Sequence, residues 1–196
     1  MPETIMKEDL HRCRWCNLKN PFYVEYHDKE WGVPEYDDHK LFELLILENF
    51  QAGLSWECVL NKRSAFREAF DGFDLDTVCG YGEEKIAELL QNKNLIRNKL
   101  KMSAAVTNAN VFRKIQNEYG TFAKYLWKFT DGAIVYEIGQ TSSALSDMVS
   151  KDLKKRGMKF VGTTIIYSYL QAAGIVNSHD ETCFLYAGKV SDGQQL

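Results

Sequence analysis

Two cysteine and histidine pairs stand near opposite ends of the chain. Cys13 and His27 lie near the start, and His179 and Cys183 lie near the end. Three residues separate His179 from Cys183, so on a helix both would face one side and could bind one ion. Two thiolates and two imidazoles form a closed tetrahedral zinc site of the structural kind, because no position stays open for water. The alternative is a small buried hydrophobic Cys183 and a hydrogen-bonded surface His179.

Cys16 is a competing ligand for the same ion. It forms a C-x-x-C with Cys13, which is itself a common zinc pattern, so either thiol could supply the N-terminal ligand. The five cysteines, an odd number, argue against a disulfide framework and for a reducing compartment. The first residues lack a signal-peptide pattern, and the most apolar windows, 41–47 and 165–173, have the length of core helices. We therefore expect a cytoplasmic monomer with no membrane partner.

A carboxylate at Glu48 faces the apolar side of a predicted helix. On a helix over residues 38–51, Glu48 points between Leu41 and Leu45, whereas Glu43 lies on the opposite side. A buried carboxylate needs a partner or a function. Glu48 could therefore cap a neighbouring helix, pair with a lysine or bind a ligand.

Aromatic side chains are concentrated in the first 56 residues. They are Trp15, Tyr23, Tyr26, Trp31 and Trp56. Several rings beside one buried carboxylate are typical of a pocket for a flat, cationic or hydrogen-bonding heterocycle. The alternatives are rings that only pack the N-terminal segment onto the body, or a cage for a quaternary ammonium or methyl-lysine ligand.

The charges of the chain are segregated, although its formal net charge is only −3. Residues 1–60 have a net charge of −6 and residues 92–130 a net charge of +7. A further basic cluster consists of Lys151, Lys154, Lys155, Arg156 and Lys159. Local density of lysine and arginine favours binding to a phosphate backbone, because sequence-independent affinity comes from local rather than total charge. Solvated helix faces are the alternative.

The sequence predicts one compact all-α unit over residues 1–196 with an extended N-terminal arm. All three prolines fall within the first 34 residues, so helices can follow one another from there on. Apolar periodicity and cap residues predict helices over about 38–50, 55–70, 74–80, 82–91, 95–118, 121–129, 143–156 and 161–173. Residues 133–138 form the only strand-like segment.

Four motifs resemble the signatures of the 3-methyladenine DNA glycosylase I family. They are YHDKEWGVPE at 26–35, QAGLSW at 51–56, KKRGMKFVGTT at 154–164 and GIVNSH at 174–179. The resemblance extends from about Cys13 to Cys183. It implies a helix-hairpin-helix glycosylase fold that binds DNA and excises an alkylated base, with a hairpin near residues 92–98. It also implies that a zinc ion joins the N-terminal arm to the C-terminal segment.

The resemblance implies a role for individual residues. Glu48 corresponds to the pocket acid, and Tyr26 and Trp56 to its base-binding neighbours. Trp15, Tyr23 and Trp31 correspond to surrounding aromatic positions. The implied zinc ligands are Cys13, His27, His179 and Cys183. Asn94 stands in the hairpin where relatives often have glycine, and asparagine tolerates the left-handed conformation that glycine would adopt there.

The predicted function is monofunctional hydrolytic release of 3-methyladenine from double-stranded DNA during base-excision repair. Methylation of adenine at N3 leaves a cation whose glycosidic bond is already weak, so recognition and positioning matter more than a strong general acid. Leu54 is a candidate wedge for the vacated base stack, although an ordinary core leucine is the alternative. Lys154, Lys155 and Arg156 are candidate DNA contacts. A non-catalytic, zinc-stabilised DNA-binding module is the alternative function.

Overall fold

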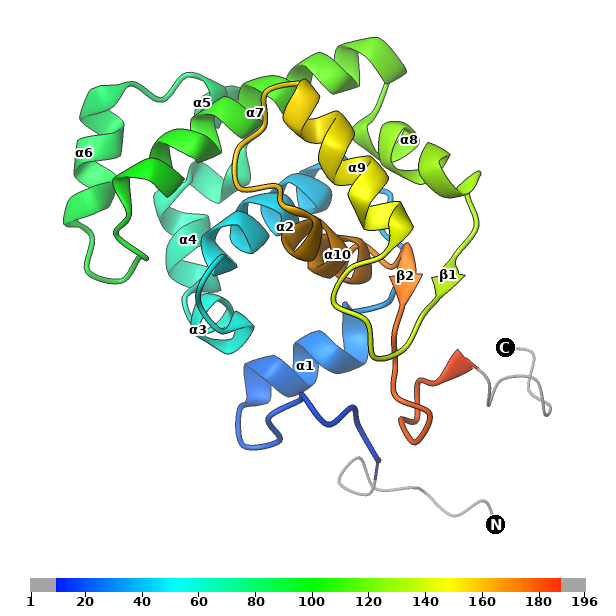
Figure 1. The fold of residues 1–196 in the computed structure, drawn as a ribbon. Coiled ribbons are helices and arrows are strands. Elements are labelled where there is room, and N and C mark those ends of the chain that lie inside the picture. Colours follow the sequence, from blue (N-terminus) through cyan, green and yellow to red (C-terminus); the bar gives the residue numbers. More distant parts are fainter. Residues whose placement is uncertain (1–9, 188–196) are drawn as a thin grey trace.

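Helices make up most of the computed structural model, which describes residues 10–187 (Figure 1). The elements are α1 (Pro21–Lys29), α2 (Asp38–Gln51), α3 (Trp56–Leu60), α4 (Arg63–Ala69), η2 (Asp71–Phe73), α5 (Leu75–Cys79), α6 (Glu83–Gln91), α7 (Lys99–Tyr119), α8 (Phe122–Trp127), η3 (Lys128–Thr130), β1 (Val135–Tyr136), α9 (Ala144–Lys155), α10 (Thr163–Ala172) and β2 (Val176–Asn177). The prediction of a mostly helical chain is confirmed. Within the described residues, no helix is both long and apolar enough to cross a membrane.

Helix α2 lies in the middle of the helical body (Figure 1). It begins as predicted, because the Asp37 side chain accepts hydrogen bonds from the backbone N–H groups of His39 and Lys40. Every side chain over residues 41–50 is buried, since α3, α7, α8 and α10 all pack against this helix. A polar side chain in such a helix must find its partner inside the protein or bind a ligand.

Helix α1 replaces much of the extended arm that the sequence predicts. Asn20 caps it by accepting a hydrogen bond from the N–H of Phe22, and Pro21 occupies the first turn, where its missing N–H has no consequence. The prediction of an irregular arm is wrong here. Proline breaks a helix interior but is favoured in the first turn, particularly when a cap residue precedes it. The buried residues of α1 are Tyr26 and His27.

The helix predicted over residues 55–70 is divided into α3 and α4. Ser55 caps α3 as expected, by accepting a hydrogen bond from the N–H of Cys58. The helix ends at Asn61, whose side-chain oxygen accepts a hydrogen bond from Nδ2 of Asn20 at 2.8 Å. Neither glycine nor proline marks the break in the sequence, so periodicity alone continues through it.

Residues 92–98, where the sequence predicts a hairpin, form the turn between α6 and α7. Residues 92–98 are not helical, so α7 begins at Lys99 rather than at residue 95. The side chain of Asn92 accepts a hydrogen bond from the N–H of Asn94 at 2.9 Å, which shapes the turn. Asn94 is exposed and is not among the described residues with positive φ. The expectation of a left-handed conformation at Asn94 is therefore wrong, because the Asn92 side chain forms the turn without one.

The strand predicted over residues 133–138 is only two residues long. It is β1, and it pairs in parallel with β2, with Val135 opposite Val176. The sequence did not predict β2, because a two-residue strand has no periodicity to detect. The ends of the described chain lie side by side, since the N–H of Phe184 donates to the carbonyl of His11 at 2.8 Å.

Candidate functional site

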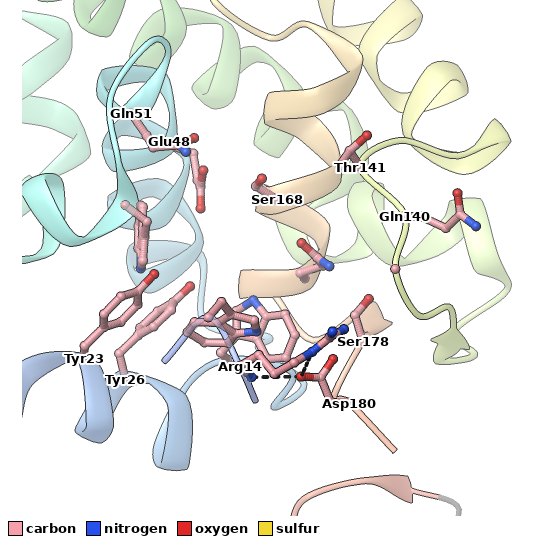
Figure 2. A pocket seen from close by; sticks show the side chains of 15 residues that line it. Arg14, Tyr23, Tyr26, Glu48, Gln51, Gln140, Thr141, Ser168, Ser178 and Asp180 are labelled. Carbon is pink, nitrogen blue, oxygen red and sulfur yellow. Dashed lines mark hydrogen bonds and ion pairs between the residues drawn. The ribbon is translucent and has the colours of Figure 1, made fainter. Parts of the chain in front are cut away.

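A cavity of about 550 Å³ opens between α1, α2, α3, α10 and the loop that precedes α9 (Figure 2). This volume lies within the usual range for small-molecule sites. Its lining residues are Arg14, Trp15, Tyr23, Tyr26, Trp31, Glu48, Gln51, Trp56, Gly139, Gln140, Thr141, Ser168, Gln171, Ser178 and Asp180. All six residues that the sequence assigned to the pocket are among them, although they come from four separate segments.

Glu48 is the acidic group in the deep part of the cavity. Its side chain comes from α2 and is 2% exposed, and its Oε2 atom has no hydrogen-bond partner among the described residues. Burial raises the pKa of Glu48 to about 8, because the low-dielectric surroundings disfavour the charged form. A cation or a hydrogen-bond donor that entered the cavity would offset this cost.

The aromatic residues form the walls beside Glu48. The rings of Tyr26 and Trp56 lie with their centroids 5.2 Å apart, and Trp15 contacts Trp31 edge to face at 4.7 Å. Trp15 also packs on Tyr23 at 5.3 Å. Burial holds the pKa of Tyr26 well above its usual value, so its hydroxyl stays a neutral donor. These walls suit a flat, polarisable ring.

Two further polar atoms in the cavity lack partners. They are Oε1 of Gln51 and Nε1 of Trp56, both buried and without a hydrogen bond among the described residues. With Glu48 they offer two acceptors and one donor to a bound molecule. The sequence prediction omitted Gln51, although its position three residues after Glu48 places both on one side of α2. It also omitted Ser168 and Gln171. These two polar residues lie three positions apart on the largely apolar helix α10, a spacing that places both on one face and can be detected in the sequence.

Leu54 lies outside the cavity lining, on the turn between α2 and α3. Its side chain is 41% exposed, and the preceding Gly53 has a φ of 80° that favours glycine. The alternative of an ordinary core leucine is therefore wrong, because Leu54 is directed to the surface. A half-exposed leucine at the end of the helix that bears Glu48 remains a candidate wedge.

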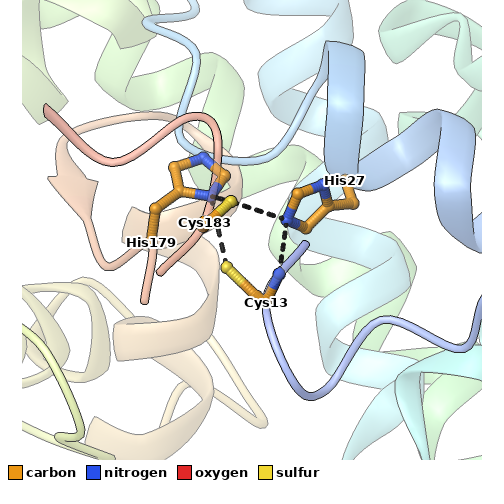
Figure 3. A group of neighbouring side chains, drawn as sticks. All are labelled: Cys13, His27, His179 and Cys183. Carbon is orange, nitrogen blue, oxygen red and sulfur yellow. Dashed lines mark hydrogen bonds between the residues drawn. The ribbon is translucent and has the colours of Figure 1, made fainter. Parts of the chain in front are cut away.

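The four Cys and His residues from both chain ends meet in one buried cluster (Figure 3). Their ligand atoms all lie within 4.8 Å of one another. Sγ of Cys13 is 3.4 Å from Nδ1 of His179, and Sγ of Cys183 is 3.5 Å from Nε2 of His27. Cys16 is outside the cluster, because its Sγ points to the carbonyl oxygen of Tyr23 at 3.7 Å.

The donor set and two of the distances in the cluster fit a tetrahedral zinc site. Bonds of about 2.0–2.3 Å to nitrogen and sulfur place the ligand atoms roughly 3.5 Å apart in a tetrahedron, close to the two distances above. Nδ1 of His27 also contacts Oδ1 of Asp28 at 2.8 Å, and Arg12 donates two hydrogen bonds to the same carboxylate. Such a carboxylate fixes the ring so that the other nitrogen can bind metal.

His179 and Cys183 do not share a helix, which corrects the prediction from their spacing. Residues 178–183 form an irregular segment and a turn, in which the N–H of Cys183 donates to the carbonyl of Asp180 at 2.7 Å. Burial raises the pKa of Cys13 to about 12 and lowers the pKa of His179 to about 4. The first change opposes formation of the Cys13 thiolate, which a cation bound at this position would favour.

The basic residues that the sequence predicts to contact DNA lie outside the cavity. Lys154 and Lys155 are exposed at the C-terminal end of α9, about 15–17 Å along the helix axis from its start near the cavity. Arg156 is held by Asp152 and by Glu118, each at 2.6 Å. Part of the positive charge of this basic cluster is therefore neutralised by acidic residues within the protein.

The chain is similar to proteins of known activity over most of its length. A family model described as methyladenine glycosylase matches residues 15–186. DNA-3-methyladenine glycosylase 1 of Escherichia coli (strain K12) is 44% identical over 186 residues, which cover 91% of this chain and 98% of that protein.

Solved structures show the same fold. A crystal structure of 3-methyladenine DNA glycosylase I superposes with a TM-score of 0.86 at 44% identity, and covers 90% of this chain and 100% of that one. The Staphylococcus aureus 3-methyladenine DNA glycosylase I, described in terms of 3-methyladenine recognition, has a TM-score of 0.82 at 35% identity and covers 91% and 95%.

Proposed function

The chain belongs to the methyladenine glycosylase family, and we propose that it is a base-excision-repair DNA glycosylase that releases 3-methyladenine from alkylated DNA. The observation in the structure that most supports this is the carboxyl of Glu48. It is buried in a cavity walled by Tyr26 and Trp56, and one of its oxygens has no hydrogen-bond partner in the part of the chain that the structure describes. The relatives with the same fold carry the name of this activity.

Glu48 distinguishes the damaged base by its charge. Adenine methylated at N3 within DNA is a cation, whereas unmodified adenine is neutral. Because burial raises the pKa of Glu48 to about 8, the carboxylate form is costly in the protein and is favoured when a cation comes close. A charge-assisted hydrogen bond then forms only with the alkylated base.

The remaining cavity atoms recognise the shape and edge of the purine. The nucleotide leaves the base stack and its ring packs on Trp56. The Tyr26 hydroxyl, kept neutral by burial, donates at the base edge. The buried groups of Gln51 and Trp56, which have no hydrogen-bond partner among residues 10–187, supply a further acceptor and donor. Each buried polar group satisfied by the correct base would be left unpaired by a wrong one.

The chemistry is monofunctional hydrolysis. The alkylated base departs as a neutral molecule, so the glycosidic bond needs little acid assistance once the nucleotide is held in position. Water attacks the sugar carbon, and the phosphates of the DNA stabilise the positive charge that develops there. No lysine is among the cavity-lining residues in the described part of the chain. Attack by a lysine amine, which would precede strand cleavage, is therefore not part of the proposal.

Double-stranded DNA is the proposed partner. Leu54, half-exposed beside the cavity, fills the gap left by the flipped base. The hairpin that contains Asn94 and the exposed Lys154 and Lys155 contact the phosphate backbone. We further propose that the protein acts as a monomer. We place this activity in the cytoplasm, where the five free cysteines stay reduced.

The Cys/His cluster is proposed to bind a structural zinc ion through Cys13, His27, His179 and Cys183. The ion supplies no activated water here, because all four positions are filled by protein. The cluster also supports the cavity wall, since Trp31 packs edge to face on His179 with ring centroids 4.7 Å apart. These residues thus hold the N-terminal segment, and the rings it carries, against the C-terminal turn.

Zinc content and melting test the metal proposal. Cys13→Ser and His179→Ala should lose the one zinc per chain, lower the melting temperature and reduce activity through disorder of the aromatic wall. Cys16→Ser is the matched control and should keep the zinc, because Cys16 lies outside the cluster. Zinc loss from Cys16→Ser alone would reverse the assignment. A parent protein that contains no metal and is fully active would contradict the zinc proposal.

Release of free base from methylated duplex tests the function. Chromatography of the supernatant should show 3-methyladenine produced by the parent and not by Glu48→Gln, with the DNA strand left uncleaved. A folded parent that binds duplex without releasing base would instead support the non-catalytic DNA-binding module. Tighter binding of choline than of 3-methyladenine would support the quaternary-ammonium cage.

A further inference from the structure

One lysine of the basic segment, residues 92–130, is buried. Lys101 lies in the first turn of α7 and is 6% exposed. Its ammonium group donates hydrogen bonds to the carbonyl of Phe50 at 2.9 Å and to the carbonyl of Ala52 at 2.5 Å. Its charge is therefore directed into the protein and is not available to a DNA phosphate.

The two acceptors belong to the C-terminal end of α2. Carbonyl groups at a helix C-terminus lack N–H partners within the helix and carry partial negative charge, so a cation stabilises them. The same helix end carries Gln51 of the cavity wall, with Glu48 one turn earlier and Leu54 on the turn that follows. Lys101 thus fixes the part of the chain that forms one side of the cavity.

The backbone of Lys101 is tied to the hairpin. The N–H of Lys101 donates to the side chain of Asn98, the last hairpin residue, at 3.1 Å. One residue therefore joins the hairpin at residues 92–98 to the end of α2. The Lys101 side chain extends from the backbone beside the hairpin to its ammonium group at the end of α2.

A second buried polar contact joins the same helices two turns further along α7. Nδ2 of Asn108 donates to Oδ1 of Asn49 at 2.6 Å and to the carbonyl of Lys159 at 2.9 Å. Asn49 in turn donates to the carbonyl of Phe160, whose φ of 54° is unusual for a side-chain-bearing residue. With Lys101 at one point and Asn108 at another, α2 cannot turn or slide against α7 without breaking a buried hydrogen bond.

We propose that Lys101 is a positioning residue that holds the base cavity in register with the DNA-binding hairpin. The inference rests on the proposed function, in which the hairpin contacts duplex and the cavity receives the flipped base. Loss of the ammonium would leave two helix-end carbonyls without a donor and allow the 51–55 turn to shift relative to the hairpin. The base would still fit the cavity, but a base attached to hairpin-bound DNA would reach it misplaced.

The test compares Lys101→Met with Lys99→Met. The control removes the same charge from the same helical turn, from a side chain that is 69% exposed. Three quantities are measured: affinity for undamaged duplex, affinity for free 3-methyladenine, and the single-turnover rate of base release from methylated duplex. Both affinities should agree between the variants within about threefold, whereas Lys101→Met should release base at least about tenfold more slowly, since a misplacement of about 1 Å can cost roughly a hundredfold in rate.

Each other outcome overturns the inference. Equal release rates in the two variants would show that Lys101 does not position the cavity. A parallel loss of free-base affinity would show that it only supports the cavity wall, and weaker duplex binding than Lys99→Met would show that it acts on DNA affinity. If Lys101→Met does not fold, Lys101→Gln, which keeps a donor on a shorter stem, is held to the same comparison. A parent that releases no base would overturn the proposed function and this inference together.

Discussion

Helix α2 carries two buried glutamates, Glu43 and Glu48, which differ in their partners. Glu43 is 3% exposed and Glu48 is 2% exposed. Oε1 of Glu43 accepts hydrogen bonds from Arg63 at 2.6 Å and from Arg67 at 2.8 Å. Oε2 of Glu48 has no partner among the described residues. The two positions are about 140° apart around the helix, so they face different surroundings.

The difference separates a structural carboxylate from one that is available to a ligand. Glu43 joins α2 to α4, and Arg63 extends the network to Glu30 at 2.7 Å. Every charge in that network has an opposite charge beside it. Glu48 faces the cavity, where the compensating charge must come from outside. Burial of both residues is equal, so the presence of a partner, rather than depth, indicates which one is functional.

At constant pH, the largest effect of a single substitution is expected from Glu43→Gln. Loss of the carboxylate leaves the 12% exposed Arg63 with only part of its charge compensated, and breaking a buried ion pair from one side costs about 3 kcal/mol of unfolding free energy. Urea unfolding followed by circular dichroism measures this. Below its melting temperature the variant should bind 3-methyladenine as the parent does. Weak binding with unchanged stability would contradict the structural role of Glu43.

Glu48→Gln should give the opposite result. The amide keeps the size of the side chain but loses the charge, so affinity for a cationic base should fall by more than about tenfold, or about 1.5–3 kcal/mol for a charge-assisted hydrogen bond. The probe is 3,9-dimethyladeninium, whose charge is permanent, with neutral adenine as control. Unfolding free energy should stay equal or rise. Unchanged affinity for the cation would remove Glu48 from the recognition step.

The pH dependence of stability isolates the cost of burying Glu48. Its pKa is about 8 in the folded protein and near 4.5 when unfolded, so the folded state binds more protons between these values. Unfolding free energy therefore falls as pH rises through this window, by at most about 1.4 kcal/mol per pH unit for one group. The parent should lose stability relative to Glu48→Gln between pH 5 and pH 8, and other groups cancel in the difference. A constant difference would show that the carboxyl is not desolvated.

Local signals predicted most of the helices because each start depends on one cap. The side chains of Asp37, Ser55, Asp74 and Ser143 all accept hydrogen bonds from backbone N–H groups in the first turns of their helices. One of the failures depends on a contact between distant residues. The division of the 55–70 helix coincides with a hydrogen bond from Asn20, on a segment far away in the chain.

The site was predictable to the extent that it depends on side-chain direction. The inward direction of Glu48 follows from helical periodicity alone. The choice between Cys13 and Cys16 did not follow from spacing, because it depends on how the segment after residue 13 turns toward His179. Ser168 was missed because a polar residue on a helix is usually a solvated one, although its spacing with Gln171 on the apolar helix α10 could have indicated the cavity that both residues line.

The smallest effects are expected at the C-terminal end of α9. Like Glu43 and Glu48, the charged residues there differ in whether another described residue pairs with them. Arg156 resembles Glu43, since Asp152 and Glu118 hold it and its guanidinium lies 5.2 Å from the centroid of the Tyr125 ring. Lys154 and Lys155 are exposed and form no ion pair with another described residue. They are therefore among the residues of this cluster that can release counterions from DNA phosphates.

The double variant Lys154→Ala/Lys155→Ala should weaken binding to damaged and undamaged duplex alike. If each lysine contacts one phosphate, the slope of log affinity against log salt should become shallower by about 1.8, because each contact contributes about 0.9. Arg156→Ala should leave that slope unchanged and instead lower the unfolding free energy by about 1 kcal/mol, as expected for a partly exposed ion-pair network. Affinity titrations at several salt concentrations, with urea unfolding of each variant, distinguish the two. A slope that changes only in Arg156→Ala would show that its pairs open when DNA binds, and that partners within the protein do not exclude a residue from the DNA interface.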